Sequence, residues 1–282
     1  MSFSRSIAPV VLALSALAAC GGEATPPPKT APAPSTAPSG ATSAAPSAQP
    51  AASGEVPKEL RAIVEASDRD DADKKLDAGR KPAELLAFAG IKPGMRVAEI
   101  AAGGGYTTEL LARAVGPTGA VFGQNTPWML EKFADKPWSA RLAKPVNAKV
   151  AKVTRELDDP LPPEAKDLDA VLDVLFYHDT FWLKVDRAKM NQAIFRALKP
   201  GGVYVVVDHS AKKGAGANDV QTLHRIEESI VREEIEKAGF KLAASAEFLR
   251  SPGDSRDWNA SPGAAGDKRG TSDRFVLRFV KP

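Results

Sequence analysis

The chain of 282 residues is poor in the residue types that build disulfide and metal frameworks. It contains one cysteine and three histidines, so it can form no internal disulfide, and no segment has the compact spacing of a structural zinc site. A Gly-x-Ser-x-Gly turn is also missing, which argues against a serine hydrolase. The formal net charge is only +3, and no basic stripe is interleaved with aromatic residues. We therefore expect no nucleic-acid partner.

A long hydrophobic run is missing as well, because the apolar core from Ile7 to Leu17 is shorter than the ~20 residues that cross a bilayer. With a positive charge ahead of it and small residues behind it, it predicts a secretory signal peptide over residues 1–19. Leu17-Ala18-Ala19-Cys20 resembles the lipobox of bacterial lipoproteins. The resemblance implies cleavage before Cys20 and lipid, including palmitate, on that residue. An ordinary exported chain with a stray cysteine is the alternative.

Large apolar side chains are absent from Gly21 to about Gly54, a stretch made almost entirely of Ala, Pro, Ser, Thr and Gly. Such a segment cannot form a core, and its prolines favour extended conformations. We therefore expect residues 20–55 to be a lipidated cysteine and a disordered tether. Because Gly21 resembles the outer-membrane sorting pattern, the expected location is the cell envelope, on the periplasmic face of the outer membrane.

Residues 56–282 are long enough for one α/β domain with a sizeable core. Apolar strand patterns alternate there with helical patterns, which predicts a doubly wound, mostly parallel sheet. Strands are expected over residues 96–100, 119–125, 146–154, 168–176, 203–207, 241–249 and 274–280. Helices are expected over residues 58–66, 82–89, 185–198 and 219–238, and after residues 105 and 126. The charged segment 68–75 is predicted to be a solvated helix face.

The most informative stretch is residues 96–111, where a short apolar run ends on Gly103, Gly104 and Gly105 and a helical pattern begins at once. It predicts a strand, a tight turn and a helix. Glycines there let the backbone approach a ligand and offer its N–H groups at a helix N-terminus. This is a general arrangement for holding a nucleotide-like cofactor.

Three segments resemble class I S-adenosylmethionine-dependent methyltransferases: residues 99–105, residues 119–125, and Leu198-Lys199-Pro200-Gly201-Gly202 before an apolar strand. Shorter motifs at residues 80–86, 177–179, 208–209 and 222–225 resemble a bacterial group called predicted methyltransferases. The resemblance implies a Rossmann-like sheet of seven strands with an antiparallel last strand. It also implies S-adenosylmethionine as cofactor and a small molecule as substrate.

The resemblance further implies which residues contact the cofactor. They are Glu99, Ala101, Gly103, Gly104, Gly105, Tyr106, Asn125 and Asp158. Glu99 is expected near the cofactor's amino group. The family usually has an acid where Asn125 stands, to accept both ribose hydroxyls, and a glycine where Ala101 stands; an amide accepts more weakly than a carboxylate. Asp158 or Asp159 matches the position that contacts adenine, with a solvated turn as the alternative.

His178 directly follows the fourth expected strand and His209 the fifth, so both are expected at the edge where ligands of such sheets bind. A neutral histidine can remove a proton from the methyl acceptor. We predict that His178 is this base, that Tyr177 positions the substrate and that Asp179 or Asp208 orients the ring. His209 is the second candidate for the base.

The remaining histidine, His224, is expected in the helix after the fifth strand, where with Arg225 it pins that helix or contacts the methionine carboxylate. A metal site is the less favoured interpretation of the histidines and their neighbouring acids. Its candidate ligands are His178, Asp179, Asp208 and His209. The prediction is that no metal is bound. The loop over residues 251–273 is long enough to cover the pocket, or is a simple hairpin connection.

Two functions remain open. One is a membrane-anchored methyltransferase acting on a small molecule. The other is a catalytically inactive methyltransferase-like lipoprotein that binds a ligand or a partner in the envelope. Asn125 and Ala101 favour the second and the histidines favour the first. The lipobox also conflicts with the cofactor, which is made inside the cell.

Overall fold

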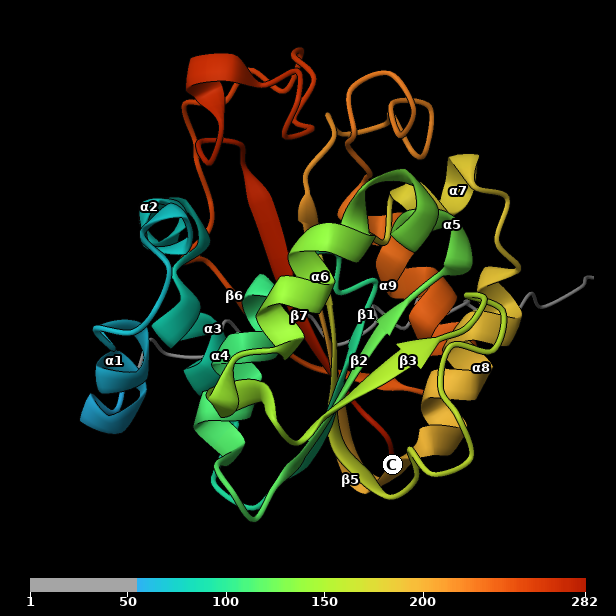
Figure 1. The fold of residues 1–282 in the computed structure, drawn as a ribbon. Coiled ribbons are helices and arrows are strands. Elements are labelled where there is room, and N and C mark those ends of the chain that lie inside the picture. The colour runs from blue at the N-terminus through green and yellow to red at the C-terminus, as the bar shows by residue number, and fades with distance from the viewer. Residues whose placement is uncertain (1–54) are drawn as a thin grey trace, which may run out of the picture. The chain divides into compact units, whose positions relative to one another are not determined.

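The computed structural model describes residues 55–282, whose elements are labelled in Figure 1. The predicted signal peptide, the lipidation site Cys20 and the tether up to residue 54 lie outside the described residues.

Within residues 55–282, seven strands form one sheet in the order β3-β2-β1-β4-β5-β7-β6. The strands are β1 (Arg96–Ile100), β2 (Ala120–Asn125), β3 (Val150–Thr154), β4 (Leu168–Val174), β5 (Leu198–His209), β6 (Lys241–Ala246) and β7 (Arg274–Val280). Strands β1 to β5 pair in parallel, whereas β7 pairs antiparallel with both β5 and β6. The predicted fold class, a doubly wound and mostly parallel sheet of seven strands with an antiparallel last strand, is confirmed.

Helices cover both faces of this sheet (Figure 1). One face carries α1 (Lys58–Val64), α3 (Pro82–Ala89) and α4 (Tyr106–Val115), and the other carries α8 (Arg187–Ala197) and α9 (Glu228–Lys237). The side chains of β5 alternate between the two layers, with Val205 packed in the first and Tyr204 in the second. The apolar run of β5 is therefore buried on both faces, as an inner strand of such a sheet requires.

Further helical segments connect these elements. They are α2 (Asp71–Arg80), α5 (Pro127–Met129), the π-helical turn η1 (Leu130–Ala134), α6 (Asp135–Leu142), η2 (Pro145–Asn147), α7 (Asp179–Trp182) and η3 (Gly266–Lys268). No helix in the described part of the chain combines the length and the apolarity that crossing a membrane would need.

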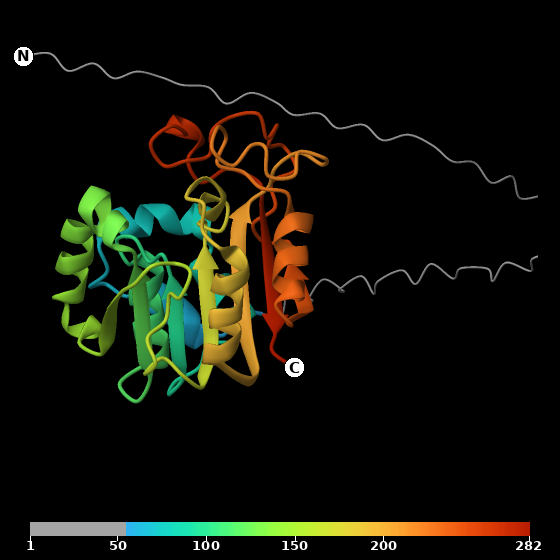
Figure 2. The same cartoon turned by 90° about the vertical axis from the view of Figure 1, so that its right-hand side faces the viewer.

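The strand order reverses between β1 and β4, and in open α/β sheets ligands bind outside the carboxyl ends of the strands at such a point. Figure 2 shows these strand ends together at the top of the sheet. The loops that precede α9 and β7, drawn in orange and red, lie above them. The sheet therefore presents one covered edge on which a site can be built.

The predicted helix over residues 219–238 is wrong in its first half, since α9 begins only at Glu228. Before it, the backbone turns at His224, whose φ is 49°. Arg225 is fully buried there and donates to Asp254 and to the main-chain oxygens of Ser210 and Trp258. These tertiary contacts override the local helical pattern, so His224 lies in a loop at the carboxyl edge and not in a helix.

Candidate functional site

A cavity of about 870 Å³ opens at the carboxyl edge of β1, β4 and β5. We call its side formed by Glu99, residues 101–104, Tyr106 and Thr107 the glycine wall, and its side formed by His178, Asp179, His209 and His224 the histidine wall. The loop before β7 also lines the cavity, through residues 260–262 and 269–271, so it covers the pocket as the sequence suggested. The predicted site residues that line the cavity are Glu99, Ala101, Gly103, Gly104, Tyr106, His178, Asp179 and His209. Those that do not line it are Gly105, Asn125, Asp158 and Tyr177.

The turn after β1 keeps space free where side chains would otherwise stand. Gly103 has a φ of 56°, and a Cβ at this position would meet no atom within 4 Å. Ala101 is also left-handed, with a φ of 51°, which costs a residue with a Cβ roughly 1 kcal/mol. Its N–H donates to Gln124 Oε1 at 2.8 Å, which helps to hold this conformation. The alanine therefore keeps the backbone shape that a glycine would give.

Asn125 is fully buried, and its side chain is used by the turn itself. Its Oδ1 accepts from the N–H of Gly103 at 2.8 Å, and its Nδ2 donates to the carbonyl oxygen of Gly103 at 3.1 Å. The prediction that this amide accepts from the ribose hydroxyls does not fit these contacts. Asn125 instead fixes the glycine wall from behind.

Glu99 is the last residue but one of β1, just before the turn, and reaches the cavity while being 4% exposed. Thr108 on α4 donates a hydrogen bond to its carboxylate. Burial raises the pKa of Glu99 to about 7, and the hydrogen bond from Thr108 only partly offsets this effect. A carboxylate in this position is costly to ionise unless a cation comes to it, and an ammonium group would supply one.

Gly105 lies outside the cavity because its role is to let a large side chain pack closely. A Cβ on Gly105 would lie 2.5 Å from the ring of Trp138, and one on Gly123 would lie 2.4 Å from it. Trp138 on α6 is fully buried. The two glycines thus admit one indole between β2 and the start of α4.

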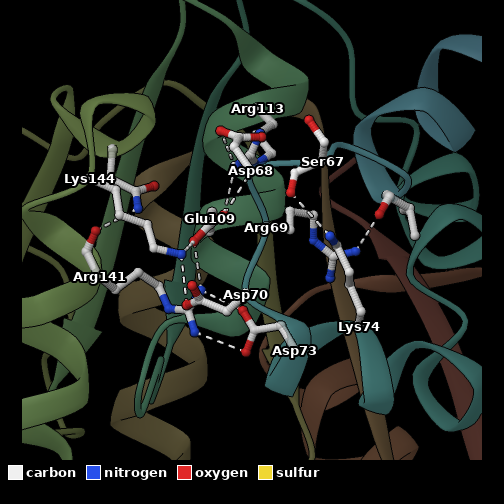
Figure 3. Close-up of polar contacts among 12 residues, drawn as sticks. Ser67, Asp68, Arg69, Asp70, Asp73, Lys74, Glu109, Arg113, Arg141 and Lys144 are labelled. Atoms are coloured by element: carbon white, nitrogen blue, oxygen red, sulfur yellow. Dashed lines mark hydrogen bonds and ion pairs between the residues drawn. The ribbon is translucent and has the colours of Figure 1, made fainter.

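A network of charged side chains, drawn in Figure 3, joins α2, α4 and α6 and also reaches the turn. Arg141 on α6 donates to the carbonyl oxygen of Gly104, to Asp73 at 2.6 Å and to Glu109 at 2.7 Å. Lys144 joins Glu109 at 3.1 Å and Asp70 at 2.7 Å. The segment 68–75 is therefore not a simple solvated helix face: its acids tie the start of α2 to α4 and α6.

Three arginines line the cavity without an ion-pair partner among residues 55–282; Arg269 is exposed, whereas Arg80 and Arg274 are more buried. Arg80 stacks 4.5 Å from the centre of the Tyr106 ring, and burial lowers its pKa. Arg274 is 3% exposed and donates to Ser272 Oγ and to the carbonyl oxygen of Gly79. Burial and repulsion from Arg80 and Arg225 lower the pKa of Arg274 to about 10. Buried guanidinium groups that have no carboxylate partner favour a bound anion.

Tyr177 and Asp158, both predicted to touch a ligand, face elsewhere. Tyr177 is fully buried, and its hydroxyl donates to Glu234 at 2.9 Å and accepts from Asn191 at 2.9 Å. These partners lie on α9 and α8, so Tyr177 anchors the helical layer and cannot position a substrate in the cavity. Asp158 is exposed and accepts from the N–H of Asp186, which is the contact of a turn residue.

The histidine wall is built around His178, which is 2% exposed. Its Nδ1–H donates to Asp208 Oδ1 at 2.7 Å, as the sequence suggested for one of the two neighbouring acids. Its Nε2 lies 3.1 Å from Asp179 Oδ1 and 3.1 Å from His224 Nδ1. His209 Nδ1 is paired with Ser272 Oγ at 2.7 Å. The three histidines thus meet at one place although they come from three separate segments.

The protonation of His178 does not suit a general base at neutral pH. Burial opposes its charge, but Asp208 and Asp179 outweigh burial and raise the pKa of His178 to about 10. With these partners the ring is an imidazolium, which donates a proton and cannot accept one. His209 differs, because burial and the positive charges of Arg274 and His178 hold its pKa well below the usual value.

No protein-family model matches the chain. Its fold is similar to that of a methyltransferase dependent on S-adenosylmethionine from Aquifex aeolicus, with a TM-score of 0.51 and 19% identity over 76% of this chain and all of that one. A structure of the Haloferax volcanii methyltransferase and its activator Trm112 gives 0.50 and 19%, over 80% and 98% of the two chains. The [4+2]-cyclase SpnF gives 0.50 and 16%, over 73% and 81%.

These likenesses show the fold alone: the chain has the fold of class I S-adenosylmethionine-dependent methyltransferases. Since a cyclase shares this fold, the fold alone does not fix the reaction, and the argument for function has to come from the site.

Several residues that build the site had no signal in the sequence. Trp138 and Arg141 lie in α6, in a region where the sequence predicted only a helix after residue 126, and Arg274 begins β7. Each acts through a contact with a segment far away in the chain, such as Gly104 for Arg141 and Gly79 for Arg274. The sequence singled out His224 but predicted it in a helix. Its place beside His178 depends on the loop conformation found there instead.

Proposed function

We propose that the protein is an S-adenosylmethionine-dependent methyltransferase that acts on a small molecule. The observation that carries this proposal is that the glycine wall and the histidine wall face a single cavity of about 870 Å³. Ligand sites of several hundred Å³ hold small molecules, and this one has room for a cofactor beside an acceptor.

The glycine wall supports the cofactor half of the proposal. The open space at Gly103 admits the methionine end of the cofactor, and Glu99 and Arg80 offer opposite charges near it. An ammonium group would favour the ionised form of Glu99, and a carboxylate would offset the uncompensated charge of Arg80. An α-amino acid group carries both.

The histidine wall supports the acceptor half. Methyl transfer needs the acceptor atom aligned with the sulfonium methyl, and fixed side chains supply this alignment. Asp208 fixes the ring of His178, and Ser272 fixes the ring of His209. In this arrangement both ring nitrogens of His178 are held by neighbouring side chains, whereas His209 is the neutral ring that faces the cavity.

For the location, the proposal is a mature chain anchored by lipid at Cys20 on the periplasmic face of the outer membrane. Residues 20–55 would be the tether and residues 56–282 the methyltransferase-like domain. The support is the lipobox and the composition of the tether.

A second candidate function is binding of a ligand or partner without catalysis. One observation favours it: both polar groups of the Asn125 side chain, at the end of β2, are hydrogen-bonded to Gly103. This position therefore offers no carboxylate to accept from a ribose. The proposed location outside the cytoplasm points the same way, because S-adenosylmethionine is made inside the cell.

Calorimetric titration of the purified protein with S-adenosylmethionine separates the two candidates. We expect saturable binding that Gly103→Arg abolishes, because the new side chain would fill the cavity. Gly201→Arg is the matched control: Gly201 is also left-handed, with a φ of 76°, and has open space around it, but it lies at the opposite edge of the sheet. Absence of binding at millimolar cofactor would exclude the methyltransferase and leave the second candidate.

A further inference from the structure

Three side chains of the histidine wall bring one donor atom each to a common point. His178 Nε2 lies 3.1 Å from Asp179 Oδ1 and 3.1 Å from His224 Nδ1, and the last two atoms are 3.2 Å apart. Within residues 55–282 this is the one group of three or more His, Cys, Asp or Glu side chains whose donor atoms converge so closely. The three atoms form a nearly equilateral triangle.

Hydrogen bonds alone cannot satisfy this triangle. If His178 Nε2–H and His224 Nδ1–H both donate to Asp179, the two N–H groups face each other across 3.1 Å. If His224 Nδ1 instead accepts from His178, its lone pair is used there and it has no proton to offer Asp179 Oδ1, 3.2 Å away. With Asp179 as a carboxylate, every placement of the ring protons therefore leaves one of the three contacts between two like groups.

A single cation satisfies all three contacts at once. A metal ion about 2 Å from each atom, the usual distance for nitrogen and oxygen ligands, would hold them about 3 Å apart on one face of its coordination shell. Two imidazoles and one carboxylate are ligands that suit iron, cobalt, nickel and zinc better than magnesium or calcium. Each of the three residues also lines the cavity.

The surroundings fix these donors in the manner of a metal site. The Nδ1–H of His178 donates to Asp208 at 2.7 Å, which leaves Nε2 for a metal, and metal-bound histidines commonly have such a carboxylate partner. The indole N–H of Trp182 donates to Asp179 Oδ1 at 2.7 Å. His224 holds a left-handed backbone, with a φ of 49°, next to the buried and fully paired Arg225. Such strain persists where the surrounding structure imposes it, often at functional sites.

We propose that His178, Asp179 and His224 bind one first-row divalent metal ion, with its remaining coordination positions open to the cavity. The ligand set differs from the one considered on the sequence, because Asp208 supports His178 from behind and His209 pairs with Ser272. The site does not depend on methyl transfer. A measurement of metal binding tests it, and the result does not depend on whether the protein binds S-adenosylmethionine.

The test is metal titration of the purified full chain after treatment with a chelator, without any cofactor. Co²⁺ is followed by visible absorption, and Zn²⁺ by calorimetry. We expect one ion per chain. His224→Ala should weaken binding at least about 100-fold, and Asp208→Asn about 10- to 100-fold. His209→Ala is the matched control, a histidine of the same wall outside the triangle, and should bind metal like the unaltered chain.

His224 is the ligand chosen for truncation because its side chain is 24% exposed, so its loss should leave the fold intact, as circular dichroism would confirm. The single thiol is excluded as the ligand if Cys20→Ser binds metal equally well. Binding that survives His224→Ala unchanged, or a folded chain that takes up no metal at 1 mM, would overturn the proposal.

Discussion

The two walls of the cavity are built on opposite principles. In the glycine wall the polar groups behind the turn are paired with each other, as Asn125 is with Gly103 and Arg141 is with Gly104, so the wall offers a fixed shape. In the histidine wall, donor atoms of His178 and His224 converge on Asp179 and compete for the same partner. Satisfied contacts therefore fix the shape of the glycine wall, whereas the donor atoms of the histidine wall leave a contact that hydrogen bonds do not satisfy.

The largest effect should come from removing the indole on which the shape of the glycine wall depends. Trp138→Ala deletes a fully buried side chain packed against Gly105 and Gly123 and should lower the free energy of unfolding by about 3–5 kcal/mol. Chemical denaturation measures this loss. Trp128→Ala, at a residue that is 39% exposed, is the control and should cost about 0.5 kcal/mol or less. Equal losses would mean that the wall is not held by Trp138.

Breaking the histidine wall should instead give a loss that depends on pH. The pKa of His178 is raised to about 10, so its contribution to stability is complete below 6.5 and disappears as the pH rises through 10. Asp208→Asn takes away the partner of this buried charge and should cost about 3–5 kcal/mol at pH 6.5. Thermal unfolding in the presence of a chelator should show a clearly smaller loss at pH 10.5. A loss that is the same at both pH values would contradict the assigned charge.

Glu99 allows the same kind of pH test on the glycine wall, because it is the carboxyl group of that wall. Its pKa is raised from 4.5 to about 7, so the stability it contributes is complete below 4.5 and is lost as the pH rises through 7. Glu99→Gln does not ionise, and between pH 4.5 and 8 its stability relative to the unaltered chain should rise by about 3 kcal/mol. Denaturation midpoints across this range test it. Glu59→Gln, at an exposed acid, is the control and should show no such trend.

The smallest effect should come from introducing an acid at the end of β2, where the resemblance to methyltransferases implies one. Asn125→Asp replaces a donor to the carbonyl oxygen of Gly103 by a second acceptor, and should destabilise the protein by about 1–3 kcal/mol. Affinity for S-adenosylmethionine should fall or stay the same, because the side chain faces the turn. Tighter binding of the cofactor by this variant would show that Asn125 does reach the ribose.

The sheet could be predicted from the sequence because its signals are local. The apolar runs of β1, β4 and β5, and the glycines between β1 and α4, each indicate their structure without reference to the rest of the chain. The local helical pattern at residues 219–238 gave a wrong prediction for the first half of that segment. There Arg225 forms a buried ion pair with Asp254, 2.8 Å away.

The site was predictable only in part for the same reason. His178 and His209 follow strands that end at the same edge, so the sequence placed both correctly at the cavity. The directions of side chains were not predictable: Tyr177 turns to Glu234 in the opposite layer, and Asn125 turns back to Gly103. His224 joins His178 only because a loop from a distant segment brings it there.

A crystal structure with S-adenosylhomocysteine would show whether one cavity holds the cofactor between the two walls. We predict density for the amino-acid end against Gly103, Gly104 and Glu99, with the sulfur directed toward His178 and His209. Density elsewhere, for example in the separate cavity of about 610 Å³ lined by Ala62, Val115 and Pro145, would contradict the account.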